Sequence, residues 1–81
     1  MKNRSRINIL SSILESAIGG ETRIKIMYKS YLSYAQLREY LSILLKSSLL
    51  EYEEGREIYR TTKKGLRYMA TCEKIDKMVA A

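Results

Sequence analysis

The amino-acid sequence predicts a small α+β domain that is mainly helical, and three observations support this fold class. The chain has 81 residues, enough for one domain with a single small core. Apolar residues recur at helical spacing in four segments, whereas two short strand-like runs flank a glycine between the third and fourth. We therefore expect one domain over residues 1–81, with helices at 5–18, 22–29, 33–46 and 62–79 and a hairpin at 49–61.

The first predicted helix begins at Ser5, whose hydroxyl suits an N-cap. Gly19–Gly20 should end it, because glycine adopts the left-handed conformation after a helix without a steric penalty. Between these signals, apolar residues recur with the period of a helix, at Ile7, Leu10, Leu14 and Ala17.

The second and third predicted helices are joined by a short connector at residues 30–32. The second begins at Glu21 or Thr22, ends near Lys29, and is apolar on more than one side, which is typical of a helix between two others. Ser33 should cap the third, which has the clearest helical period in the chain. Its predicted buried face consists of Leu37, Tyr40, Leu41 and Leu44.

The hairpin is predicted from two runs, 49–53 and 57–61, around a turn at 54–55 or 55–56. The side chains expected to face inward are Leu50, Tyr52, Tyr59 and Thr61. Thr62 then caps the last helix, and Gly65 in its first turn should cost about 1 kcal/mol relative to alanine. An apolar stripe follows, consisting of Leu66, Met69, Cys72, Ile75 and Val79.

Composition restricts the function. Fifteen Lys and Arg residues against nine Asp and Glu give a formal charge of +6, which indicates either a polyanionic partner or ordinary solubilising charge. The chain has no histidine and one cysteine, which excludes a Cys/His zinc site, a histidine general base and a disulfide framework. We expect no metal, no cofactor and no enzymatic activity. Packing is the expected role of Cys72, although pairing with its own copy across a two-fold axis stays open.

The sequence predicts a cytoplasmic protein that does not enter a membrane. No apolar run approaches the roughly 20 residues of a bilayer-spanning helix. Residues 1–6 are basic, as at the start of a signal peptide, but no clean apolar segment follows them.

A helix, a short turn and a second helix followed by a two-stranded hairpin form the winged helix-turn-helix arrangement, with a three-helix core, a wing and a C-terminal helix. In this arrangement the third helix is the recognition helix, and its polar side suits base edges in a major groove. The alternative for these side chains is the plain solvated face of an amphipathic helix. The candidate base-reading residues are Tyr34, Gln36, Arg38 and Ser42.

Phosphate contacts are expected where helices begin and where basic residues gather, because free N–H groups and the helix dipole attract anions. The wing is acidic, with Glu51, Glu53, Glu54 and Glu57. Either Arg56 at its tip contacts DNA while the acids face away, or the wing contributes little. The candidate phosphate-binding residues are Arg4, Arg6, Thr22, Arg23, Lys25, Ser33 and Arg56.

Four segments resemble a known family: TRIKIMYK at 22–29, LSYAQLREYL at 32–41, LLEY at 49–52 and YRTTKKGL at 59–66. They are similar to the archaeal winged-helix DNA-binding proteins of the small, basic, ten-kilodalton chromatin type. The resemblance extends from Ile7 to Tyr68. It implies a winged helix, duplex DNA as ligand, an archaeal or archaeal-virus source, and a homodimer formed through the C-terminal helix.

Two departures limit what the resemblance implies. The best-known members have a longer C-terminal helix, whereas residues 62–81 span only about 30 Å as a helix. The acidic hairpin is the second departure. On the resemblance, the dimer contact would use the apolar stripe Leu66, Met69, Cys72, Ile75 and Val79.

These observations together predict a nucleoid-associated, homodimeric transcriptional regulator that binds double-stranded DNA. Two alternatives stay open. One is an architectural chromatin protein with little sequence preference, because the family contains both kinds. The other is a winged-helix module that docks on proteins, which the acidic hairpin favours.

Overall fold

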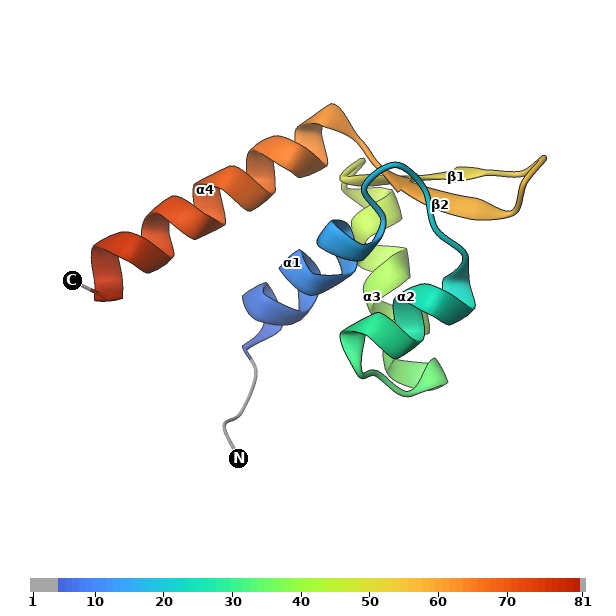
Figure 1. Cartoon of the computed structure of the whole chain (residues 1–81), viewed down its shortest axis with the longest axis horizontal. Coiled ribbons are helices and arrows are strands. Elements are labelled where there is room, and N and C mark those ends of the chain that lie inside the picture. Colours follow the sequence, from blue (N-terminus) through green and yellow to red (C-terminus); the bar gives the residue numbers. More distant parts are fainter. Residues whose placement is uncertain (1–4, 81) are drawn as a thin grey trace.

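The computed structural model describes the backbone of residues 5–80, and their side chains except those at 76, 79 and 80. Three helices, a two-stranded antiparallel sheet and a fourth helix follow one another (Figure 1). The predicted fold class, α+β and mainly helical, is therefore confirmed. The elements are α1 (Arg6–Ser16), α2 (Arg23–Ser30), α3 (Tyr34–Lys46), β1 (Leu50–Glu53), β2 (Ile58–Thr61) and α4 (Lys63–Ala80).

The core lies where α1, α2, α3 and the start of the hairpin meet. α1 buries Ile13 and Leu14 of its second half, Ile9 and Leu10 pack partly buried against the core, and Ile7 in the first turn is 50% exposed. α3 buries three of its four predicted core residues, and Tyr40 packs partly buried against them. The buried apolar residues are Ile13, Leu14, Ala17, Ile26, Leu37, Leu41, Leu44, Leu49 and Leu50.

A hydroxyl caps each helix N-terminus. Ser5, Thr22, Ser33 and Thr62 each accept a hydrogen bond from the backbone N–H three residues later, at distances of 3.0–3.4 Å. This explains why the helices begin one residue after the predicted starts at 5, 22, 33 and 62: the capping residue has extended rather than helical backbone dihedrals.

The first helix ends at Ser16 and not at the predicted residue 18. The carbonyl of Ala17 accepts hydrogen bonds from the amides of Gly20 and Thr61, so the chain turns away from the helix there. Gly19 and Gly20 have φ of 82° and 104°, a region that favours glycine, and they complete the reversal. Pairing with β2 therefore shortens the helix that periodicity alone would continue.

The hairpin pairs Leu50 with Thr61 and Tyr52 with Tyr59, which puts these four side chains on one face. Leu50 and Thr61 are buried, whereas Tyr52 stays 44% exposed and stacks on Tyr59 with ring centroids 4.8 Å apart. The turn lies where it was predicted, around Gly55, and it is longer than either predicted pair of residues. Residues 54–57 form a four-residue loop, and its left-handed residue is Glu57, with φ of 55°.

β2 is joined to the helices as well as to β1. The backbones of Glu21 and Tyr59 exchange two hydrogen bonds, of 2.9 and 2.8 Å, as a short third strand would. The Thr61 hydroxyl donates to the carbonyl of Leu14 in the core. The wing is therefore fixed to the segment between α1 and α2.

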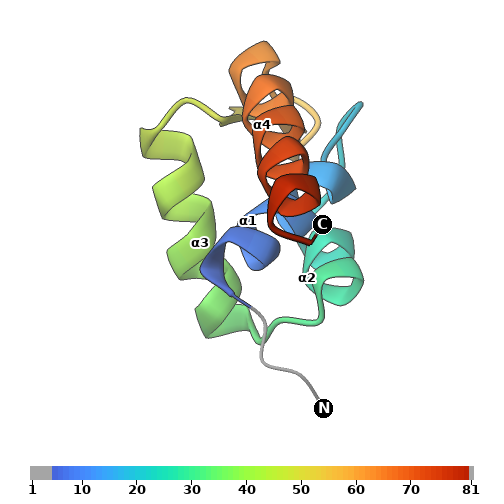
Figure 2. The same ribbon diagram turned by 90° about the vertical axis from the view of Figure 1, so that its left-hand side faces the viewer.

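α4 starts in a tight contact and then leaves the core. The Thr62 amide donates to the carbonyl of Leu49, and a Cβ on Gly65 would overlap that same carbonyl and lie 2.7 Å from Cγ2 of Thr61. Glycine at position 65 is therefore required by close packing. Beyond this contact, α4 runs past α1 and extends outside the body of the other helices (Figure 1 and Figure 2).

We expect Gly65→Ala to lower the free energy of unfolding by about 1–3 kcal/mol, because the added methyl group overpacks the contact with Leu49 and Thr61. Urea denaturation measures the change. Gly55→Ala is the matched control, since a Cβ at that position meets no atom within 4 Å. Equal stability of the two variants would contradict the packing role of Gly65.

Candidate functional site

α3 has one apolar side and one hydrophilic side. Leu37, Leu41 and Leu44 attach it to the core, while Arg38 and Ser42 on its outer side are exposed. Tyr34, in the first turn, is 49% exposed. The hydrophilic side of α3 is therefore accessible to a large ligand.

Two shallow hollows adjoin this side of α3. The first, which we call the α3 hollow, has a volume of about 320 Å³. The second, which we call the wing hollow, has a volume of about 280 Å³. Arg23 and Tyr59 line both. The α3 hollow is otherwise lined by Tyr34, Arg38, Leu41, Ser42 and Leu45. The wing hollow is otherwise lined by Thr22, Ile24, Tyr52, Arg56 and Glu57.

Arg23, the first residue of α2, lines both the hollow beside α3 and the hollow beside the wing. Its Cζ is 5.2 Å from the centroid of the Tyr34 ring, which is a cation–π contact. Burial raises the pKa of the Tyr59 hydroxyl, and the nearby charge of Arg23 acts in the opposite direction. Arg23, Tyr34 and Tyr59 therefore form one cluster drawn from three different elements.

The hydrogen bonds of Ser33 and Gln36 are directed at each other. The Ser33 hydroxyl accepts from the Gln36 amide at 3.2 Å, and the Gln36 side-chain oxygen accepts from the Ser33 amide at 3.0 Å. This capping box begins α3. Gln36, a candidate base-reading residue, lines neither hollow, and its carboxamide oxygen is already used.

The start of α2 is occupied in a similar way. Thr22 accepts from the Lys25 amide, and its own amide donates to the carboxylate of Glu21. Lys29 also donates to that carboxylate, at 3.1 Å. An acidic group thus already lies at this helix N-terminus, where Thr22 was expected to meet a phosphate, while Lys25 is exposed.

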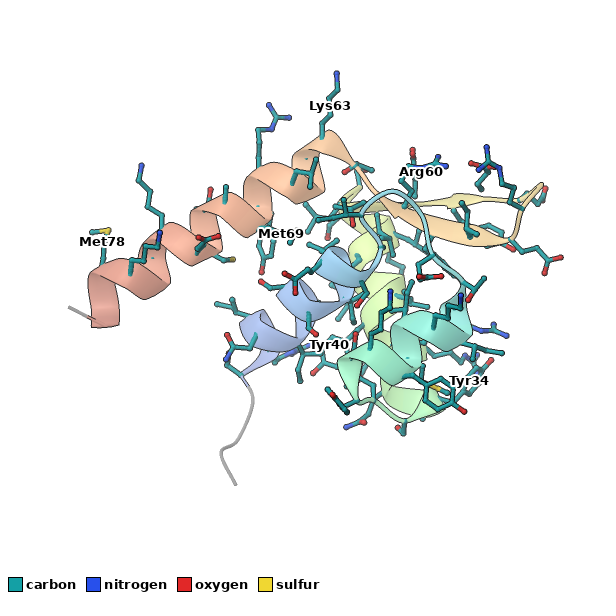
Figure 3. All side chains as sticks on the ribbon, in the orientation of Figure 1. Tyr34, Tyr40, Arg60, Lys63, Met69 and Met78 are labelled. Atoms are coloured by element: carbon teal, nitrogen blue, oxygen red, sulfur yellow. The ribbon has the colours of Figure 1, made fainter. Side chains whose placement is uncertain are left out.

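Two further basic candidates are Arg6 and Arg4. The described residues that line the hollows do not include Arg6. Arg6 extends from α1 over the Tyr40 ring, with its Cζ 5.8 Å from the centroid. Tyr40 is labelled with Tyr34 in Figure 3, where the two rings lie at separate places on the molecule. Arg4 falls outside the described residues.

Two of the four acids of the wing, Glu51 and Glu53, are paired with its own arginines. Glu53 binds Arg60 at 2.9 Å and Arg56 at 2.8 Å, and Arg60 also approaches Glu51 at 3.8 Å. Figure 3 shows Arg60 on the side of the hairpin that points away from α2 and α3. Because side chains alternate along a strand, Tyr52 and Tyr59 lie on the other side.

Six residues that line the hollows were not predicted as site residues: Ile24, Leu41, Leu45, Tyr52, Glu57 and Tyr59. The tyrosines were assigned to packing, and the pairing of Tyr52 with Tyr59 was the available signal that they share a face. Leu45 follows a buried leucine and belongs to the same apolar run, so nothing local distinguishes it. Yet its side chain is 37% exposed.

The predicted stripe of α4 is divided between two environments. Met69 and Cys72 are half-buried and line a cleft of about 330 Å³ against α1, whereas Leu66 and Ile75 are 44% and 52% exposed. The side chain of Val79 lies outside the described residues. The other residues that line this cleft are Asn8, Ser11, Ser12, Glu15 and Glu73.

Within residues 5–80, no three His, Cys, Asp or Glu side chains come together as metal ligands would. None of the described helices combines the length and the apolar character that crossing a membrane requires. The chemistry that the two hollows offer is that of arginine, tyrosine and serine donors beside exposed apolar carbon.

The chain is similar to known proteins in its sequence and in its structure. Residues 3–80 match the family model described as winged helix-turn-helix. The structure is similar to that of Sso10a-2, described as a DNA-binding protein from Sulfolobus solfataricus, with a TM-score of 0.83. The sequences are 25% identical, and the match covers 95% of this chain and 83% of that one. No curated protein matches the sequence.

Glu21 connects α2 to the wing, and its ionisation is testable. Hydrogen bonds from Lys29 and from the Thr22 amide hold the pKa of Glu21 below its ordinary value. The ionised carboxylate therefore stabilises the fold above the pKa of the unfolded chain, and this contribution is lost as the pH falls through the lower, folded pKa.

We expect Lys29→Met to raise the pKa of Glu21 toward its ordinary value in a carboxyl NMR titration, because the strongest partner is removed. Lys25→Met is the matched control, since Lys25 acts on Glu21 only through its charge and more weakly. Equal shifts in the two variants would contradict the assignment.

Proposed function

The chain belongs to the winged helix-turn-helix family, and on this premise we propose that it is a homodimeric, sequence-specific transcriptional regulator that binds double-stranded DNA through α3. The observation that carries the proposal is the open hydrophilic side of α3, which lies beside Arg23 and below the wing. A helix exposed in this way fits a major groove. The description of Sso10a-2 as a DNA-binding protein supports the same function.

In this proposal, α3 provides the base contacts. Arg38 and Ser42 present donors along the α3 hollow, and Tyr34 lies near its edge. Gln36 contributes through its amide nitrogen, because its oxygen is held by Ser33. Arg38 is the strongest candidate, since arginine can form two hydrogen bonds with guanine.

Phosphate contacts would surround these base contacts. The positive charge of the basic residues that make them adds a salt-dependent and largely sequence-independent part of the affinity. The ion pair with Glu53 makes Arg56 a weak member of this group, and the cap of α2 does the same for Thr22. The proposed phosphate-binding residues are Arg4, Arg6, Thr22, Arg23, Lys25, Ser33 and Arg56.

The homodimer would form through α4. This helix extends beyond the other three (Figure 1). It exposes Leu66 and Ile75, which a second copy would cover. Met69 and Cys72 already contact the cleft beside α1, so they would support the interface from the inner side of the helix. Two copies of α3 would then address half-sites about one helical turn apart, or a multiple of it.

An architectural role with little sequence preference is the second candidate. The capping box favours it, because Gln36 has one polar end fewer for distinguishing bases. Footprinting on genomic DNA separates the two roles: discrete protected sites support a regulator, and uniform coverage supports an architectural protein.

We expect Arg38→Ala to cost about 1–3 kcal/mol of affinity for a preferred duplex and to relax sequence choice at one position. The preferred duplex is obtained by selection from a random pool, and binding is titrated at about 50 and 200 mM salt. Arg67→Ala, at an exposed position of α4, is the matched control. A protein without affinity for any duplex at the lower salt concentration is not a DNA-binding protein, and a docking module would then be the better candidate.

We expect Ile75→Glu to convert the dimer to a folded monomer, because the substitution places a charge on an exposed apolar side chain of α4. Sedimentation velocity measures the mass, and circular dichroism shows that the helices are retained. Lys74→Glu, at the neighbouring exposed position, changes the charge by more and should remain dimeric. If Ile75→Glu also sediments as a dimer, α4 is not the interface.

A further inference from the structure

Arg23 and Tyr59 stand between the two hollows and line both of them. We propose that these two side chains, with Tyr34 beneath the guanidinium, clamp one backbone phosphate of the bound duplex. One DNA strand would then pass over Tyr59, from the α3 hollow to the wing hollow. This inference rests on the proposed DNA binding, and it adds a residue of the wing and a different role for Tyr34.

Backbone pairing fixes the distance between the two parts of the clamp. Tyr59 exchanges two hydrogen bonds with Glu21, and Arg23 follows Glu21 by two residues. The Thr22 cap then sets the direction in which α2 begins. Tyr59 and Arg23 are therefore held together without a ligand, so little order has to be created on binding.

The charge of Arg23 is available to a phosphate. Glu53 pairs with Arg56 and Arg60, and Glu21 pairs with Lys29, while Glu57 lines the wing hollow with Arg23. None of the ion pairs within residues 5–80 involves Arg23. Unlike Arg56 and Arg60, Arg23 therefore has no described ion pair that a phosphate would have to break.

Tyr34 acts here as a positioning residue. The Arg23 guanidinium lies over its ring at 5.2 Å, and stacking restricts the guanidinium plane while the N–H groups at its edge stay able to donate. Tyr34 extends from the first turn of α3, so it also couples Arg23 to the recognition helix.

Tyr59 supplies the second donor. A tilted ring contact with Tyr52, with centroids 4.8 Å apart, restricts the orientation of its ring. Burial keeps its pKa above the ordinary value, so the hydroxyl stays protonated at neutral pH and can donate to a phosphate oxygen. On either side, the exposed carbon of Ile24 and Leu45 offers contact to the deoxyribose rings that flank a phosphate.

Tyr59→Phe tests the clamp, because it removes only the hydroxyl. We expect it to weaken binding to the preferred duplex roughly tenfold, the effect of one hydrogen bond to a charged group. Tyr28→Phe is the matched control, since Tyr28 is 70% exposed and lines neither hollow. Circular dichroism and thermal unfolding verify that both variants are folded.

A scan of neutral methylphosphonates through the duplex locates the contact. For the parent protein, one position in each half-site should weaken binding beyond the general loss of charge. Tyr59→Phe and Arg23→Ala should each show a smaller loss at that position than the parent does, because one of the two donors is already missing. Arg23→Ala should also reduce the slope of log affinity against log salt by about one.

The role of Tyr34 is tested by a double-mutant cycle. Tyr34→Leu should weaken binding in the parent but have little effect in the Arg23→Ala background, whereas a role in folding alone would give equal losses in both.

Single-stranded DNA of the same sequence should bind more weakly than the duplex, and equal affinity would overturn the proposed track along a duplex strand.

The failure of the clamp can be distinguished from the failure of the proposed function. If the parent binds duplex DNA in a salt-dependent way and Tyr59→Phe matches Tyr28→Phe, the clamp is wrong and DNA binding stands. If the parent binds no duplex even at about 50 mM salt, DNA binding itself is wrong and the clamp is overturned with it.

Discussion

The attachment of β2 to the segment between α1 and α2 is the constraint on which the candidate site depends. Four backbone and side-chain hydrogen bonds form it: the pair between Glu21 and Tyr59, and the bonds from Thr61 to Ala17 and Leu14. They fix the height of the wing above α3 and bring a wing tyrosine beside an arginine of α2. An isolated two-stranded hairpin is at best marginally stable, so the wing owes its position to these bonds.

Sequence reasoning predicted the elements better than the site. The period of α3, its capping residue Ser33 and the placement of Tyr52 and Tyr59 on one face of the hairpin were predicted from local patterns, and the structure has all three. The cluster of Arg23 with Tyr59 depends on a contact between residues 36 positions apart, which no local pattern contains. The same reason applies to Gly65, whose necessity arises from the carbonyl of Leu49 rather than from its own helix.

Some charged residues among those described form ion pairs with one another, and others do not. The wing has both signs in one region, and Glu53 joins two arginines there. Within the described residues, the ion pairs leave Arg23 and Arg38 unneutralised on the side of α3 that faces outward. Glu51 and Glu53 of the acidic hairpin are paired with arginines, and Glu57 is the acid of the hairpin that lines the wing hollow.

The tight contact at Gly65 has a consequence for the assembly as a whole. α4 meets the core closely at its first turn and extends for 18 residues, so a change in its direction at the contact with Leu49 grows along the helix. At 1.5 Å per residue, a tilt of a few degrees at this contact moves the far end by roughly 1–2 Å. In the proposed pair of chains joined through α4, the close contact at Gly65 would therefore set the separation of the two copies of α3, and with it the spacing along a duplex that both can reach.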